Sequence, residues 1–412
     1  MVWTRSGPYL YFDEDHGSPS PGFRLGFPTV QEVFFDAKVG KNVYVLITSS
    51  GRRVELRQLG TTNTYEAADS SYLQLTYFID DSSVEHLWLR STDGTVMAFS
   101  RFEDEWRATV IEDRNGNSLT VNYNGYGDIT DITDTLGRVI NFNYDGNANL
   151  RTITQSWNGQ THTWATFWLP NVPVQTGFSG LVVSGVANNE QFPMLTQVAL
   201  DDGTLYKFDY TNYGQVNYIR RDIPDNVHRS YLAYNYDITS DDCPRITGVR
   251  NWAENWNVVN GAATEVLTQY GVEGNAHVLT TPDGTVYKEF YTVSATGPPW
   301  QRGLVLQTEV WSGGEQKITT TGWTQDNPSV NYQTNPRVTE TNVYDAANNR
   351  RRTTVGYQTF TLPDGASCSL PSDVYEYQAD ATNIARRTHT DYNLDANYLN
   401  RRIIGLPQTQ LL

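Results

Sequence analysis

Apolar and polar residues alternate along most of this chain, whereas the three-to-four-residue apolar spacing of an amphipathic helix is nearly absent. Alternation is typical of a β-strand that turns one face toward a buried surface and the other toward a wetter one. Clusters of Gly, Asn, Asp and Pro interrupt it at intervals of about 8–12 residues, the spacing of successive turns in an all-β protein. We therefore expect an all-β fold with on the order of 30 short antiparallel strands and almost no helix.

The clearest repetition lies in residues 113–153, where one unit is written twice. Residues 116–123 read GNSLTVNY and residues 137–144 read GRVINFNY, so the second copy starts 21 residues after the first. Each copy begins with glycine, alternates apolar and polar residues, and returns to Asn, Asp and Gly, which supply the positive-φ positions of tight hairpins. A fixed short period is typical of architectures built by adding identical units.

Asp-Gly turns mark further hairpins. Asp-Gly-Thr begins at Asp93, Asp202 and Asp283, and Asp-Gly-Ala begins at Asp364. Asp-Gly between alternating segments is among the strongest sequence signals for a hairpin turn. We expect each Asp-Gly-Thr turn to join two strands.

The repetitive character persists along the chain, which predicts one continuous β body. We divide it into an N-terminal β-hairpin region, residues 1–110, and a wall of repeats, residues 111–412, continuous with the first. Longer loops are expected at 169–178, 241–258 and 296–301, where proline and tryptophan indicate irregular backbone.

The repeated phrase resembles a known family. The pattern Gly-Arg-x-x-x-Phe-x-Tyr-Asp, followed by Asn149 and Leu150, is similar to the YD repeat of RHS-repeat proteins. That family includes bacterial polymorphic toxins, the shell-forming components of insecticidal toxin complexes, and the animal teneurins. Residues 47–75 and 398–407 also resemble segments of bacterial RHS proteins. The residues that carry the repeat are Gly116, Tyr123, Gly137, Arg138, Phe142, Tyr144, Asp145, Tyr206, Phe208 and Tyr210.

The resemblance implies a long antiparallel sheet of hairpins that spirals into a hollow YD shell, or a partial barrel of the same kind, with repeat tyrosines packed in layers. It also implies an enclosed C-terminal polypeptide, often a toxin, and a secreted or surface-exposed protein. Family members usually release that cargo by self-cleavage at an Asp-Pro core, whereas this chain contains no Asp-Pro dipeptide. We therefore expect a non-enzymatic shell segment whose partners are an enclosed polypeptide, other shell segments, or a second copy at open sheet edges.

Net charge, hydropathy and cysteine content narrow the range of partners and cellular locations. The chain has 46 acidic and 30 basic residues and a formal net charge of −16, which argues against nucleic acid, because phosphate recognition needs a basic surface. No run of 18 apolar residues predicts a membrane-spanning helix. The N-terminus lacks the apolar stretch of a signal peptide, so we expect another export route or a longer product. Cys243 and Cys368 are too few for a disulfide framework; one bridge between them is the alternative, and we expect two buried free thiols.

Catalytic, cofactor and metal patterns are not found in the sequence. It has no Gly-x-Ser-x-Gly elbow, no P-loop and no Rossmann glycine fingerprint, and its six histidines lack i, i+2 or i, i+4 pairing. Residues 145–149 resemble the opening of a calcium loop, but Leu150 and Ser156 occupy the positions of its glycine and glutamate, so we expect an Asx turn. The densest acidic cluster is residues 13–16. We therefore assign no catalytic, cofactor-binding or metal-binding residue.

Aromatic residues, at 13%, supply much of the capacity for burial. We expect the repeat tyrosines to hold neighbouring strands together, because cross-strand aromatic pairs stabilise sheets. Three tryptophans cluster at residues 157–168, while Trp252 and Trp256 lie in a polar segment and are the better candidates for ligand contact. The alternative function is thus a secreted carbohydrate-binding or carbohydrate-active β protein. A β-propeller would need a period of about 40–50 residues, roughly twice the one observed.

Overall fold

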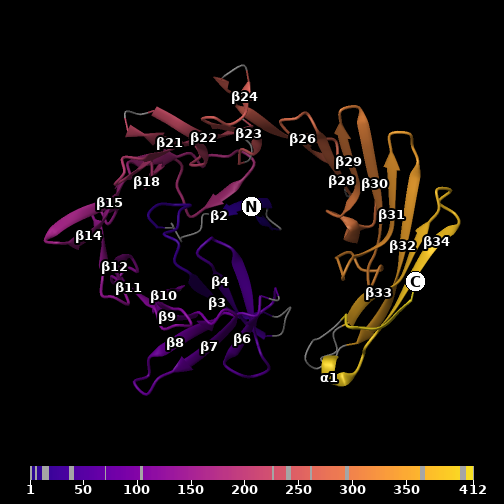
Figure 1. Ribbon diagram of the computed structural model, residues 1–412, viewed down its shortest axis with the longest axis horizontal. Helices are drawn as coiled ribbons and strands as arrows, with labels where there is room; N and C mark the ends of the chain where they lie inside the picture. The colour runs from indigo at the N-terminus through magenta and orange to yellow at the C-terminus, as the bar shows by residue number, and fades with distance from the viewer. Residues whose placement is uncertain are drawn as a thin grey trace. The chain divides into compact units, whose positions relative to one another are not determined.

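The computed structural model is almost entirely β-structure, which confirms the predicted fold class (Figure 1). The described residues include one short α-helix, α1 (Ala396–Leu399), and the 3₁₀ turn η2 (Pro299–Gln301). The structure describes residues 2–4, 7–11, 18–36, 41–69, 71–102, 105–224, 227–237, 243–259, 262–292, 297–361, 367–399 and 405–411.

The strands are short, as the turn spacing predicts. The first 22 are β1 (Val2–Thr4), β2 (Gly7–Tyr11), β3 (Thr29–Asp36), β4 (Lys41–Ile47), β5 (Arg53–Gln58), β6 (Thr64–Ala67), β7 (Gln74–Ile79), β8 (Glu85–Arg90), β9 (Val96–Phe102), β10 (Glu105–Glu112), β11 (Ser118–Tyr123), β12 (Ile129–Asp134), β13 (Val139–Tyr144), β14 (Leu150–Trp157), β15 (Gln160–Trp168), β16 (Asn171–Val174), β17 (Val182–Ser184), β18 (Glu190–Pro193), β19 (Gln197–Leu200), β20 (Leu205–Tyr210), β21 (Val216–Ile223) and β22 (Val227–Tyr236). The others are β23 (Ile246–Ala253), β24 (Val258–Val259), β25 (Ala262–Ala263), β26 (Val266–Glu273), β27 (Ala276–Thr280), β28 (Val286–Tyr291), β29 (Val305–Ser312), β30 (Glu315–Thr324), β31 (Arg337–Asp345), β32 (Arg350–Thr361), β33 (Ser367–Tyr377), β34 (Ile384–Tyr392) and β35 (Pro407–Leu411).

The chain divides into two compact units. The first comprises Met1–Ala233, Ile238–Pro244 and Trp252–Ala263, and the second comprises Tyr234–Asp237, Arg245–Asn251 and Thr264–Leu412. The boundary expected at residue 110 falls within the first unit and stays a prediction.

In the first unit, strands β3 to β10 form a closed antiparallel sheet (Figure 1). Each strand pairs with the next, and β10 returns to β3, where Trp106 lies opposite Val30. The pairing of β10 with β9 shifts register between Ala108 and Val110, and beyond that shift β10 pairs with β11 instead of β3. Because a bulge bends its strand, β10 can end the closed sheet and begin an open one.

The closed sheet is filled by side chains from all eight of its strands. Eight-stranded closed sheets have an interior just wide enough for such filling. The rings of Tyr44 and Tyr65 meet edge to face, with centroids 4.7 Å apart. The buried residues are Val30, Tyr44, Leu46, Val54, Leu56, Tyr65, Leu75, Leu87, Leu89, Phe99, Trp106 and Ala108.

The open sheet of the first unit continues from β10 through β15 and then from β19 through β22. One face carries a second buried cluster, against which Phe23, Leu25 and Phe27 pack. The buried residues of this cluster are Val121, Ile129, Phe142, Leu150, Ala165, Phe167, Leu169 and Leu195.

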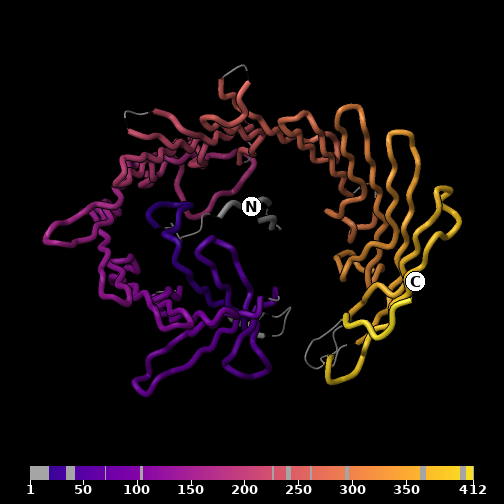
Figure 2. The backbone as a smooth tube through the Cα atoms, viewed as in Figure 1, coloured from indigo at the N-terminus to yellow at the C-terminus, as the bar shows by residue number. Residues whose placement is uncertain are grey.

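The second unit is an antiparallel series of hairpins from β26 to β35, with β23 paired to β26 (Figure 2). Its strands are long, up to the twelve residues of β32. Among its described residues, the only buried apolar side chains are those of Ala276, Trp300, Ala381 and Leu399. Most other strand positions are half-buried, so this sheet depends on cross-strand contacts more than on a buried core.

Two of the three predicted loops contain strands. The segment 241–258 contains all of β23, which pairs with β26, and 169–178 contains β16, which pairs with β18. The segment 296–301 ends in the turn η2. The prolines and polar residues of these segments suggested irregular backbone. The first two segments form strands because partner strands distant in the sequence supply their hydrogen bonds, which a local pattern cannot reveal.

Candidate functional site

Three of the repeat tyrosines, Tyr123, Tyr144 and Tyr210, each bond to a backbone carbonyl in the preceding strand or just before it. The hydroxyl of Tyr123 donates to the carbonyl of Ala108 at 2.8 Å, and that of Tyr144 donates to Ile129 at 2.9 Å. Tyr210 repeats the contact with a bond of 2.5 Å to a carbonyl fifteen residues earlier, that of Leu195. We call this arrangement the aromatic clasp.

A shift of register accompanies every clasp. Pairing with the following strand is displaced at Tyr123, Tyr144 and Tyr210, the last residue of its strand in each case. On the other side, β12 pairs with β13 without a register shift from Asp131 to Thr133, and Ile129 lies two residues before that paired segment. A bulge re-aims a side chain, so the ring reaches back over the preceding strand to its carbonyl.

Three further clasps occur in the second unit and were not predicted from the sequence. Tyr357 donates to Val338 at 2.7 Å, Tyr392 donates to Pro371 at 2.7 Å, and the indole nitrogen of Trp323 donates to the carbonyl of Val305 at 2.8 Å. Each again stands at a register shift toward the following strand. The signal available was a glycine directly before two of these aromatic residues, at 322 and 356.

Burial raises the pKa of the Tyr123, Tyr144 and Tyr210 hydroxyls well above the ordinary value for tyrosine. The hydroxyls therefore stay protonated, and remain donors, at alkaline pH where an exposed tyrosine would ionise. A phenol ionises only when water or a cation stabilises its negative charge, and the rings of Tyr123 and Tyr144 are partly enclosed beside the second core.

The residue after the clasp tyrosine closes the next turn. Asp145 Oδ1 accepts the backbone N–H groups of Asn147 and Asn149, at 2.9 and 3.1 Å. Asn124 and Thr211 make equivalent pairs of bonds in their own turns. The bond from the backbone of Asn149 is the main reason why the pKa of Asp145 lies below its ordinary value. In a Tyr-Asp pair, the tyrosine thus bonds to the preceding strand, and the aspartate accepts the hydrogen bonds that form the following turn.

The other repeat residues have structural positions as well. Gly116 and Gly137 occupy matching turns with φ of 85° and 75°. Arg138 pairs with Asp134 at 2.5 Å in the turn before β13. Phe142 is buried in the second core. Further along the chain, Phe208 packs against that core and meets Phe23 edge to face at 5.1 Å, while Tyr206 is half-buried in β20.

The Gly137 turn provides a direct test of the repeat. Gly137→Ala should lower the free energy of unfolding by about 1–2 kcal/mol, because an L-residue is strained in the left-handed region. Gly146→Ala is the matched control, since both glycines lie in open space but only Gly137 has a positive φ. Urea unfolding followed by circular dichroism would measure both. Equal midpoints for the two variants would contradict the turn assignment.

A buried carboxylate lies on the face of β20–β22 opposite the second core. Asp222 is fully buried and bonds to His228 Nδ1 at 2.7 Å, Lys207 Nζ at 3.1 Å and Arg220 Nε at 3.1 Å. Burial acts to raise the pKa of Asp222, but the bonds from His228 and Lys207 and the charge of Arg220 lower it overall. The cluster neutralises the buried charge and ties three strands together.

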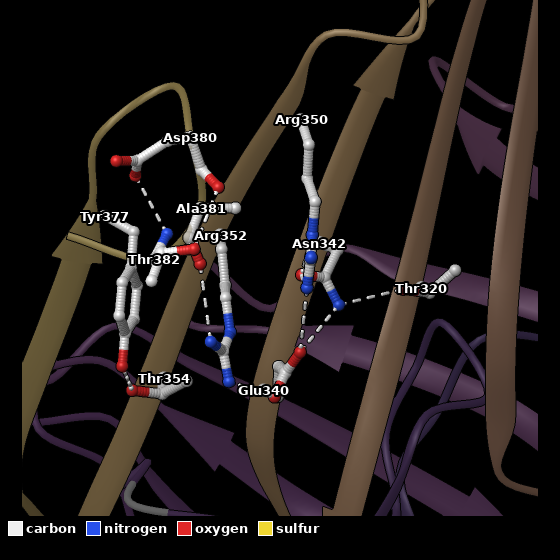
Figure 3. A network of polar contacts seen from close by, with 10 residues as sticks. All are labelled: Thr320, Glu340, Asn342, Arg350, Arg352, Thr354, Tyr377, Asp380, Ala381 and Thr382. Carbon is white, nitrogen blue, oxygen red and sulfur yellow. Dashed lines mark hydrogen bonds and ion pairs between the residues drawn. The ribbon is translucent and has the colours of Figure 1, made fainter. Parts of the chain in front are cut away.

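The second unit has its own polar network across β30–β33 (Figure 3). Glu340 accepts from Asn342 at 2.9 Å and from Arg352 at 3.0 Å, and these bonds lower its pKa. Arg350 donates to Asn342 at 2.6 Å, and the Arg352 guanidinium lies 4.6 Å from the ring centre of Tyr377. Such cross-strand pairs supply stabilisation in a sheet with few buried apolar residues.

The tryptophans proposed for ligand contact lie in different settings. Trp252 is in β23 rather than in a loop, stacks on Tyr231 at 5.5 Å, and donates to the carbonyl of Ala263. Tyr231 stacks in turn on Tyr218 at 5.3 Å. Trp256 is 45% exposed in the following turn. Ligand contact at Trp252 and Trp256 stays a prediction.

The described residues also bear on metal binding, membrane-spanning helices and the two cysteines. No group of three or more His, Cys, Asp or Glu among them could hold a metal ion. No described helix has the length and apolar character needed to cross a membrane. Neither Cys243 nor Cys368 forms a disulfide, and both are half-buried rather than buried. The acidic cluster at residues 13–16 lies outside the described residues.

No family model matches the chain, and no curated protein sequence matches it. Among solved structures, TcdB2-TccC3-TEV is 11% identical with a TM-score of 0.29, over 86% of this chain and 19% of that one. The N-terminal domain of effector protein SpvB from Salmonella typhimurium is 12% identical with a TM-score of 0.23, over 56% of this chain and 88% of that one. A porin-like protein from Bacteroides uniformis is 14% identical with a TM-score of 0.23, over 64% of this chain and all of its own length. The chain therefore spans less than a fifth of the length of TcdB2-TccC3-TEV.

Proposed function

We propose that the chain is a non-enzymatic structural segment of an RHS/YD-repeat shell, which encloses or presents a polypeptide, such as a toxin, or mediates contact between cells. One observation carries the proposal. The phrase that resembles the YD repeat is also the phrase that builds the aromatic clasp at Tyr123 and Tyr144. The repeat residues therefore serve to hold the sheet in register, as a structural wall requires.

The proposal places the protein outside the cell or at its surface, as the resemblance implies. Its partners would be an enclosed polypeptide, further shell segments, or a second copy joined at a sheet edge. Strand β35 supports an edge partner, because all five of its residues are exposed while it pairs with β34. An added strand binds such an edge through backbone hydrogen bonds.

Protease protection tests enclosure. The chain would be co-produced with the polypeptide encoded directly beside it in the genome, and the purified sample treated with a non-specific protease. We expect the neighbouring polypeptide to survive conditions that digest it alone, because a continuous sheet excludes the protease. Light scattering on the same sample would give the number of chains in each particle.

The matched control is the same polypeptide mixed with an unrelated acidic β protein. Digestion of the polypeptide at equal rates with and without the chain would reject enclosure. A particle of a single chain at all concentrations would reject self-association through sheet edges.

A further inference from the structure

The clasps of the second unit form a connected series, because the residue that accepts one clasp is also paired with the aromatic residue of the clasp before it. Trp323 pairs with Val338 at a register shift, and the Val338 carbonyl accepts the hydroxyl of Tyr357. Tyr357 pairs in the same way with Pro371, whose carbonyl accepts the hydroxyl of Tyr392. Each aromatic residue thus marks the acceptor for the next one along the sheet.

Pro407 lies at the end of this series. Tyr392 pairs with it at the register shift between β34 and β35, just as Tyr357 pairs with Pro371. Within the part of the chain that the structure describes, β34 is the only strand that pairs with β35. None of the six clasps bonds to the Pro407 carbonyl. Pro407 therefore occupies an acceptor position that lacks a donor strand.

The backbone of β35 directs the Pro407 carbonyl away from β34. The N–H of Asn393 donates to the carbonyl of Leu406 at 2.9 Å, one residue outside the pair of Tyr392 and Pro407. That bond makes Tyr392 and Pro407 a non-hydrogen-bonded pair, in which neither residue directs its own backbone polar groups at the other. The Pro407 carbonyl consequently faces the open side of β35.

Ile129 in the first unit shows what this geometry accepts. It pairs with Tyr123 at a register shift, and the N–H of Asn124 donates to the carbonyl of the residue before Ile129 at 2.8 Å. The Ile129 carbonyl thus points away from β11, and Tyr144 on the next strand donates to it at 2.9 Å. Pro407 repeats each of these features except the bond from a following strand.

Strand β35 has few of the features that ordinarily protect a sheet edge. Its sequence, PQTQL, contains no charged residue, and all five residues are exposed. Charges, prolines and bulges commonly keep other strands away from an edge. Pro407 and its register shift do not prevent pairing, because Pro371 has the same position and the same shift in β33, which pairs with strands on both sides. The open side of β35 can therefore accept a strand.

We propose that β35 binds a strand of a further shell segment, and that this strand carries a tyrosine or tryptophan that donates to the Pro407 carbonyl. The inference rests on the proposed function for the kind of partner, and it adds the edge, the register and the recognised side chain. Backbone hydrogen bonds supply the affinity of an added strand, while the clasp selects one register, because a one-residue slip moves the aromatic ring to the other face.

A second copy of the chain lacks a free strand of this kind. The strands that carry the clasps, which are β11, β13, β20, β30, β32 and β34, each pair with neighbours on both sides. A second copy would have to break one of these pairings to offer its aromatic residue. The geometry therefore favours a different polypeptide of the same repeat type.

A peptide of residues 137–145, GRVINFNYD, supplies the test strand, because it contains β13 with its clasp tyrosine and has one basic and one acidic side chain. Fluorescence anisotropy of the labelled peptide would measure its binding to the full chain. We expect saturable binding, and the Tyr144→Phe peptide should bind roughly two- to tenfold more weakly, because one hydrogen bond is lost. Only the peptide changes, so the fold of the chain is the same in both measurements.

Amide hydrogen exchange would locate the bound peptide. We expect slower exchange in β35 and unchanged exchange in the closed sheet, where β10 and β3 already pair. A scrambled peptide of the same composition is the control and should not bind. Equal affinities for the tyrosine and phenylalanine peptides overturn the proposal, as do equal binding of the scrambled peptide and protection that excludes β35. Failure of the peptide to bind overturns it too, but leaves the proposed shell function to protease protection, which measures enclosure.

Discussion

Replacing Tyr123, Tyr144 and Tyr210 together by phenylalanine should lower the free energy of unfolding by about 3–6 kcal/mol. Each change keeps the ring but removes a hydroxyl that donates to a backbone carbonyl. A lost hydrogen bond costs about 1 kcal/mol, and more where the abandoned acceptor is shielded from water. The three clasps lie on different strands, so their effects should nearly add. Urea unfolding of the full chain would measure the loss.

A triple variant with the same chemistry elsewhere provides the control. Tyr72, Tyr126 and Tyr332 are 76%, 83% and 67% exposed. Replacing these three by phenylalanine removes as many hydroxyls without opening a clasp, so stability should change by less than about 0.5 kcal/mol for each residue. If both triple variants lost equal stability, the clasps would have no special role in holding the sheet.

The clasps also predict a response to alkaline pH. Burial raises the pKa of Tyr123, Tyr144 and Tyr210 in the folded protein. In an unfolded chain, each tyrosine loses its hydroxyl proton near pH 10. The stabilisation they contribute is thus complete below about pH 10 and is lost as pH rises toward the folded-state pKa values. The difference in free energy of unfolding between the unchanged protein and the triple phenylalanine variant at Tyr123, Tyr144 and Tyr210 should shrink above pH 10. An advantage that stayed constant to higher pH would contradict buried, protonated donors.

Trp106→Ala should destabilise the closed sheet by about 3–5 kcal/mol, the usual cost of removing a large buried aromatic side chain. Trp106 is 1% exposed and lies in the strand that pairs with β9, β3 and β11. Its loss would leave a cavity beside Val30, at the seam where the sheet closes. Amide hydrogen exchange should show faster exchange in β3 and β10, together with a lower urea midpoint.

Trp88→Ala is the control on the same closed sheet, because Trp88 is 48% exposed in β8. Its cost should stay near 1 kcal/mol or less, since little apolar surface returns to water. Trp106→Phe should cost less than Trp106→Ala, because the buried indole nitrogen of Trp106 has no hydrogen-bond partner to lose. Equal midpoints for Trp106→Ala and Trp88→Ala would show that closure does not depend on the core.

The candidate site was only partly predictable. The sequence identified Tyr123 and Tyr144 because the phrase repeats within a short segment, and their structural equivalence follows from similar local sequence. It did not identify Trp323, in which an indole takes the place of the tyrosine, because the clasp depends on a bulge and an acceptor eighteen residues away.

The sequence by itself determined the strands, the turns and the alternation of buried and exposed positions, since these depend on residues close together in the chain. Asp145 and its turn are one such case. Only the tertiary structure decided that β10 returns to β3, because Val30 and Trp106 lie 76 positions apart (106 − 30) and no local pattern records their pairing. Closing so long a loop costs chain entropy, and the burial of a shared core offsets it only when all eight strands have assembled.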